Sequence, residues 1–137
     1  MNPNDARLVR IYTRKQNGVV ADETPIGGTN GGNASFEVVV EGEAGDVLGA
    51  SGAPYQLRIS AIDLTAVSNP DSAQNDFTQD ANAAFQAPDW PQFRKVFSVA
   101  LNNVPAVRNH TLRYLATLNS ANEVDSAIES DLFSLTQ

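Results

Sequence analysis

The sequence of 137 residues contains no cysteine. Without cysteine the chain has no disulfide framework, no thiolate metal site and no cysteine nucleophile. Histidine is nearly as scarce, with His110 the only one. A zinc centre needs three or four nitrogen, sulfur or oxygen ligands, so this composition argues against zinc. We therefore expect no cofactor. The lack of cysteine does not fix the cellular compartment.

Long apolar runs are also missing. The first ten residues are polar, and no stretch approaches the roughly 18 apolar residues that span a bilayer. The sequence therefore predicts neither a signal peptide nor a membrane-inserted segment. We expect a cytoplasmic protein, with export or association with a larger particle as the open alternatives.

Positive charge is in short supply, and it is unevenly placed. Nine Lys and Arg stand against sixteen Asp and Glu, which gives a net charge of −7. Four of the nine, Arg7, Arg10, Arg14 and Lys15, lie near the N-terminus, and none follows Arg113. An acidic chain of this kind is a poor partner for nucleic acid or anionic membranes. The basic beginning and acidic end suit an attraction within one molecule or between neighbours.

What the chain does have is alternation of apolar and polar residues with a period of two, the pattern of a half-buried strand. The stretch 93–118 holds two such runs, separated by a segment rich in Asn and Pro. The residues on the apolar side are Phe93, Phe97, Val99 and Leu101 in the first run, and Leu112, Tyr114, Ala116 and Leu118 in the second. We predict that this pair of strands lies at the centre of the core.

Further strands are predicted on either side of this pair. Residues 35–41 and 55–61 alternate cleanly, and 126–135 supplies the last strand. Residues 7–14 suit an edge strand, because its basic side chains discourage pairing with other edges. One predicted face of this edge strand carries Val9, Ile11 and Thr13, and the other carries Leu8, Arg10, Tyr12 and Arg14.

Two long connections separate these strands. Residues 17–34 are rich in glycine with little periodicity, which predicts a flexible loop. Residues 65–92 form a long polar connection, in which the spacing of apolar residues over 79–85 predicts two helical turns. Trp90, between two prolines, is interpreted either as a plug over the rim of the core or as a ligand-stacking aromatic.

About seven strands with turns between them is the pattern of an antiparallel sandwich. The run Leu112-x-Tyr114-x-Ala116 in the penultimate strand resembles the tyrosine corner of immunoglobulin-like and fibronectin-III-like modules. The resemblance implies an all-β, immunoglobulin-like β-sandwich of about seven antiparallel strands with at most one short helix. We expect residues 1–137 to form a single domain. The resemblance implies no particular activity.

Nothing in the sequence marks a catalytic site. His110 directly precedes a predicted strand, and no serine beside it stands out as a nucleophile, so we expect a non-catalytic chain. Calcium, which binds oxygen ligands from loops, is the better candidate among metals. Two groups of acidic residues are available for it: Asp71, Asp76 and Asp80 in the long connection, and Glu41, Glu43 and Asp46 between strands.

These observations predict a non-catalytic module for protein–protein interaction or self-assembly. The candidate contact residues are Arg10, Tyr12, Arg14 and Trp90. The glycine-rich loop would let the N-terminal strand pair with a neighbour's sheet, so the expected partner is protein, in the first place another copy of the chain. The alternative is a ligand-binding module, for carbohydrate or calcium, that uses Trp90 and the acidic loops.

Overall fold

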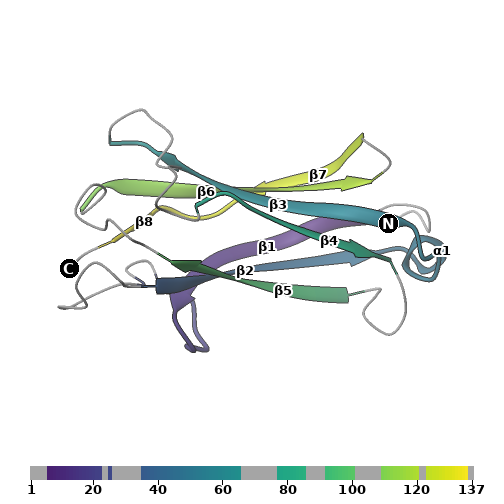
Figure 1. Ribbon diagram of the computed structural model, residues 1–137, viewed down its shortest axis with the longest axis horizontal. Helices are drawn as coiled ribbons and strands as arrows, with labels where there is room; N and C mark the ends of the chain where they lie inside the picture. The colour runs from purple at the N-terminus through teal and green to yellow at the C-terminus, as the bar shows by residue number, and fades with distance from the viewer. Residues whose placement is uncertain are drawn as a thin grey trace.

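The computed structural model describes residues 6–22, 25, 35–65, 77–85, 92–100, 109–120 and 123–135 (Figure 1). These ranges contain eight strands and one helical turn. In chain order the elements are β1 (Ala6–Lys15), β2 (Ser35–Ala44), α1 (Asp46–Gly49), β3 (Pro54–Asp63), β4 (Gln79–Ala84), β5 (Gln92–Ala100), β6 (Thr111–Ser120), β7 (Glu123–Glu129) and β8 (Phe133–Ser134). In the described part of the chain, no helix is long and apolar enough to cross a membrane.

The strands form two sheets that lie face to face (Figure 1). The three-stranded sheet has the order β1-β2-β5, and the larger sheet has the order β4-β3-β6-β7, with β8 also paired to β6. Every pairing is antiparallel. The predicted all-β, immunoglobulin-like β-sandwich is confirmed.

The core lies between the sheets and is built from the alternating positions that the sequence predicts. Its fully buried side chains include Phe36, Val38 and Val40 from β2, Leu57 and Ile59 from β3, and Leu112, Tyr114, Ala116 and Leu118 from β6. The ring of Tyr114 stacks on Phe133, with ring centroids 5.5 Å apart and planes at 8°. The predicted core strands 35–41, 55–61 and 112–118 are therefore confirmed. The pair of runs in 93–118 is central only in part: β6 lies inside the larger sheet, whereas β5 lies at an edge of the three-stranded sheet, with Phe97 and Val99 buried.

Ser130 divides the predicted last strand into β7 and β8. Its backbone N–H donates to the carbonyl of Tyr114 at 2.9 Å, and its hydroxyl oxygen accepts a hydrogen bond from the Tyr114 N–H at 2.9 Å. The side chain thus replaces a ladder partner at this point, and residues 130–132 leave the sheet edge before β8 returns to it. Phe133 and Leu135 are buried, as predicted.

The prediction of helix over 79–85 is wrong, because Gln79–Ala84 forms strand β4. Two helical turns are marginal in isolation, whereas β3 offers a row of main-chain hydrogen-bonding groups along which β4 pairs. Arg58 on β3 also holds Asp80 on β4 through two hydrogen bonds of 2.6 and 3.0 Å. The helical spacing rested on Ala81, Ala84 and Phe85. Phe85 directly follows β4 and is a buried ring against Tyr55, at 4.6 Å between centroids.

Strand β1 lies at an edge of the three-stranded sheet, as predicted, but its faces differ from the prediction. The pairing with β2 shifts between Leu8 and Arg10. This irregularity buries Leu8 and leaves Val9 half exposed, whereas strict alternation placed Val9 inward. Beyond the shift, Ile11 and Thr13 are buried as expected.

Candidate functional site

The outer face of the three-stranded sheet brings together Arg10, Tyr12 and Arg14, three of the four predicted contact residues. In this article "outer face" means Arg7, Arg10, Tyr12 and Arg14 of β1, Glu37, Val39, Glu41 and Glu43 of β2, and Arg94, Val96 and Ser98 of β5. The strand register sets these residues in cross-strand rows: Arg10–Glu41–Arg94, Tyr12–Val39–Val96 and Arg14–Glu37–Ser98. Side chains in such rows are direct neighbours.

Tyr12 is held at the centre of this face by two arginines. The guanidinium carbon of Arg10 lies 4.2 Å from the centroid of its ring, which is cation–π geometry. Arg94 donates a hydrogen bond of 2.8 Å to the Tyr12 hydroxyl, and its Nε lies 3.8 Å from Glu41. Half of the Arg94 side chain is exposed. The cluster is thus ordered before any partner arrives.

Arg14 has a different role, because it is largely buried. Its Nε lies 2.8 Å from Glu37 Oε1, and the two side chains are only 12% and 10% exposed. A charge that is withdrawn from water is costly to leave without its partner. Arg14 therefore stabilises the junction of β1 and β2, whereas Arg10, which is exposed, remains accessible.

The free edge of β1 is occupied by its own chain. The Leu8 N–H donates to the Ser126 hydroxyl at 2.9 Å. The Asp22 N–H donates to the Thr13 carbonyl at 2.8 Å, and the Thr13 hydroxyl donates to the Asp22 carbonyl at 2.7 Å. These bonds use edge groups that another strand would need, so we look for contacts on the outer face; strand exchange by β1 stays a prediction.

A cavity of about 470 Å³ opens beside this edge. It lies between β1, the segment that follows β1, and residues 130–132, where β7 has ended and β8 has not begun. Its lining residues are Tyr12, Thr13, Ala21, Asp22, Ser130, Asp131 and Leu132. Tyr12 thus borders both the outer face and this cavity.

The other predicted candidates are Trp90 and His110. Trp90 lies outside the described residues, so its two interpretations stay predictions. His110 precedes β6, as predicted for a strand-end residue, and its Nδ1 lies 2.6 Å from Oδ2 of the buried Asp63. The other oxygen of Asp63 accepts from the Thr65 N–H at 3.0 Å. These contacts tie the end of β3 to the beginning of β6, which is a structural role.

Only some of the acidic residues that suggested a calcium site lie within the described ranges. Asp71 and Asp76 lie outside the described residues, and Asp80 is bound to Arg58. In the second group the glutamates face arginines of neighbouring strands: Arg94 faces Glu41, and Arg7 faces Glu43. Within the described ranges, no three His, Asp or Glu side chains gather where they could hold a metal ion.

Sequence reasoning missed Arg94. The alternation of β5 already places Arg94 opposite the buried Phe97 and Val99, hence on the outer side. What the sequence does not contain is the strand order, which sets β5 beside β2 and brings Arg94 within reach of Tyr12 on β1.

Comparison with known proteins supports the architecture and goes no further. No family model and no curated protein matches the sequence. Among solved structures, a glycosyl hydrolase family 2 member from Bacteroides cellulosilyticus aligns over 95% of this chain and 15% of its own, with a TM-score of 0.61 and 7% identity. A candidate beta-galactosidase from Bacteroides fragilis aligns over 95% of this chain and 17% of its own, with a TM-score of 0.56 and 8% identity. The chain spans about a sixth of either protein, and the likeness shows a shared fold.

Because the Arg14–Glu37 pair is buried and the Arg7–Glu43 pair is more exposed, we predict a large loss of stability on removal of Arg14 and a small one on removal of Arg7. Arg14→Met leaves the buried carboxylate of Glu37 without its arginine. We expect this variant to lower the free energy of unfolding by about 2–4 kcal/mol. Arg7→Met, which removes an arginine that is 62% exposed, should change it by less than about 0.5 kcal/mol. Urea denaturation measures both; equal losses for the two variants would contradict the assignment.

The Arg58–Asp80 contact predicts a stability difference that depends on pH. The hydrogen bond from Arg58 lowers the pKa of the Asp80 carboxyl from its usual 3.8; burial opposes this shift, and the positive charge of Arg58 adds to it. A carboxyl with a lowered pKa in the folded state stabilises the fold above its unfolded pKa, and that stabilisation is lost as pH falls through the folded value.

Asp80→Asn should therefore lower the melting temperature by a few degrees at neutral pH, and the difference should vanish as pH falls well below 3.8. Glu129→Gln, an equal change of charge at a carboxylate that is more exposed than Asp80, serves as the control. A deficit in Asp80→Asn that persists unchanged in acid would show that the carboxylate charge is not the cause.

Proposed function

We propose that this chain is a non-catalytic protein-interaction module that binds through the outer face of its three-stranded sheet. The observation that carries the proposal is the Arg10–Tyr12–Arg94 cluster, which is ordered by its own contacts while Arg10 and Arg94 stay exposed to solvent. Tyrosine and arginine are enriched where protein interfaces gain most of their binding energy. A side chain that is already fixed loses less conformational entropy when a partner binds.

The charge of the outer face also supports a protein partner. The face carries four arginines and three glutamates, a net charge of +1, in a chain whose net charge is −7. Most of the acidic side chains thus lie elsewhere on the molecule. Opposite potentials on two surfaces guide association and fix its orientation. An acidic protein surface is the complementary partner.

Self-association is the simplest case. In the row Arg10–Glu41–Arg94, a glutamate on the central strand lies between arginines on both flanking strands. Two copies that meet face to face, offset by one strand, would set Glu41 of one copy opposite Arg94 of the other, and the reverse. Because this contact is polar and its one aromatic ring is partly buried, we propose a reversible association that weakens with salt.

Sedimentation velocity across a concentration series, at low and at physiological salt, tests this proposal. The unmodified chain should shift toward a dimer as concentration rises, more so at low salt. Tyr12→Ala and Arg10→Ala should weaken dimerisation at least tenfold, since each removes half of the cation–π contact. Ile62→Ala, at a similarly exposed position on the larger sheet (41%), serves as the control. A chain that is monomeric at all concentrations, or variants that dimerise like the unmodified chain, would overturn self-association through this face.

A further inference from the structure

Strand β5 ends the three-stranded sheet with a long, regular edge. All nine of its residues pair with β2 without a shift in register. The Ser98 carbonyl accepts a hydrogen bond of 2.7 Å from the side chain of Gln79 on β4, so the main chain at Ser98 faces away from β2. Main-chain groups in an antiparallel strand alternate in direction from residue to residue. The N–H and C=O groups of Arg94 and Val96 therefore also point outward.

The β5 edge is exposed, whereas the edge of β1 is occupied. The side chains of Gln92, Arg94, Lys95 and Val96 are all exposed, with Val96 at 38%. The main chain faces outward at Gln92, Arg94, Val96 and Ser98, and among the described contacts only the position at Ser98 is occupied. An exposed, unshifted edge is a template for one more strand.

The larger sheet leaves space for such a strand. It extends beyond β3 to β4, whereas the three-stranded sheet stops at β5. Ala81 and Ala83 of β4 pair with Leu57 and Tyr55 and so share their inward face. Leu57 is 1% exposed, yet Ala81 is only half-buried and Ala83 is exposed. A fourth strand beside β5 would extend the three-stranded sheet toward this uncovered part of β4.

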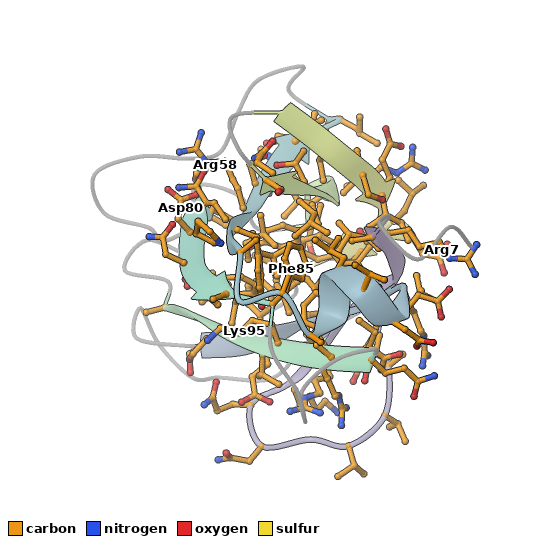
Figure 2. All side chains as sticks on the ribbon, turned by 90° about the vertical axis from the view of Figure 1, so that its right-hand side faces the viewer. Arg7, Arg58, Asp80, Phe85 and Lys95 are labelled. Atoms are coloured by element: carbon orange, nitrogen blue, oxygen red, sulfur yellow. The ribbon has the colours of Figure 1, made fainter. Side chains whose placement is uncertain are left out.

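The charge of the edge selects what can pair with it. Arg94 and Lys95 are adjacent and exposed, and Figure 2 places Lys95 between β5 and β4. Two copies of β5 brought together would place these like charges near one another, which disfavours their pairing. Because Arg94 pairs with Glu41 and Lys95 pairs with the buried Val40, the two cations lie on opposite faces of β5. Glutamate or aspartate on the outer side of the added strand would instead meet Arg94.

We infer that the β5 edge binds an extended acidic segment of a partner protein, which joins the three-stranded sheet as a fourth strand. This inference rests on the proposed protein-interaction function and names a partner for it. Main-chain hydrogen bonds to Arg94 and Val96 supply affinity in this mode of recognition, and the side chains of the added strand supply specificity. Small apolar residues on its inner side would cover Ala81 and Ala83.

The test uses the full chain and a capped nine-residue peptide of alternating valine and glutamate. Amide hydrogen exchange followed by NMR should show that the peptide slows exchange at Arg94 and Val96, with a dissociation constant below about 1 mM. The same peptide with lysine in place of glutamate should bind at least tenfold more weakly. No slowing at Arg94 and Val96 with saturating acidic peptide, or equal binding of both peptides, would overturn the inference.

Two variants separate the main-chain and charge contributions. Val96→Pro removes an outward N–H that β2 does not use, and it should abolish peptide binding while the β2 pairing persists. Arg94→Glu should reverse the preference between the two peptides, because Arg94 lies on the outer side with the charged residues of the peptide. Lys15→Glu, an equal change of charge at the end of β1, serves as the control and should leave the preference unchanged. An Arg94→Glu chain that still prefers the acidic peptide would contradict the inference even if Val96→Pro does not fold.

The result of the peptide-binding experiment is independent of the result of the sedimentation experiment on self-association. Tyr12→Ala removes the aromatic contact of the outer face but leaves the main chain of β5 intact. If Tyr12→Ala stays monomeric and still protects Arg94 and Val96 with the acidic peptide, both proposals hold. Loss of dimerisation without peptide protection in the unmodified chain would leave the interaction function standing and remove strand addition.

Discussion

The three-stranded sheet depends on β2, because both faces of this strand are buried. On the inner side Phe36, Val38 and Val40 are fully buried in the core. On the outer side Val39 is equally buried between its register neighbours Tyr12 and Val96, and Glu37 is 8% exposed beside Arg14. A strand covered on both faces fixes the register of the strands that flank it. The positions of β1 and β5, and hence of the outer face, follow from β2.

The outer face and the β5 edge both follow from the unequal widths of the two sheets. Because only β1 and β5 flank β2, the three-stranded sheet is narrower than the sheet it covers. Its β1 edge is satisfied by Ser126 and Asp22, which leaves β5 as the regular edge. Arg94 belongs to both surfaces, since its side chain bonds Tyr12 on the outer face while its main chain faces the open edge. The two proposed contacts thus share one strand.

Much of the fold could be predicted from the sequence, since the alternation in β2, β3 and β6 follows directly from burial of one strand face. The failures have physical causes. Residues 79–85 have helical spacing, but pairing with β3 outweighs a two-turn helix. Val9 is exposed because a register shift, which period-two reasoning does not see, occurs beside it. The candidate site was half predicted: Arg10 and Tyr12 share the outer face, but Arg94 joins them only through strand order.

Hydrogen exchange of the free chain, resolved residue by residue in β5, tests the incomplete sheet most directly. The account predicts an alternating pattern, in which the amides of Lys95 and Phe97, bonded to β2, exchange slowly and those of Arg94 and Val96 exchange fast. The Leu8 amide on β1, which donates to Ser126, should exchange slowly although it faces away from β2. Uniformly slow exchange along β5 would show that its edge is already occupied and would contradict the account.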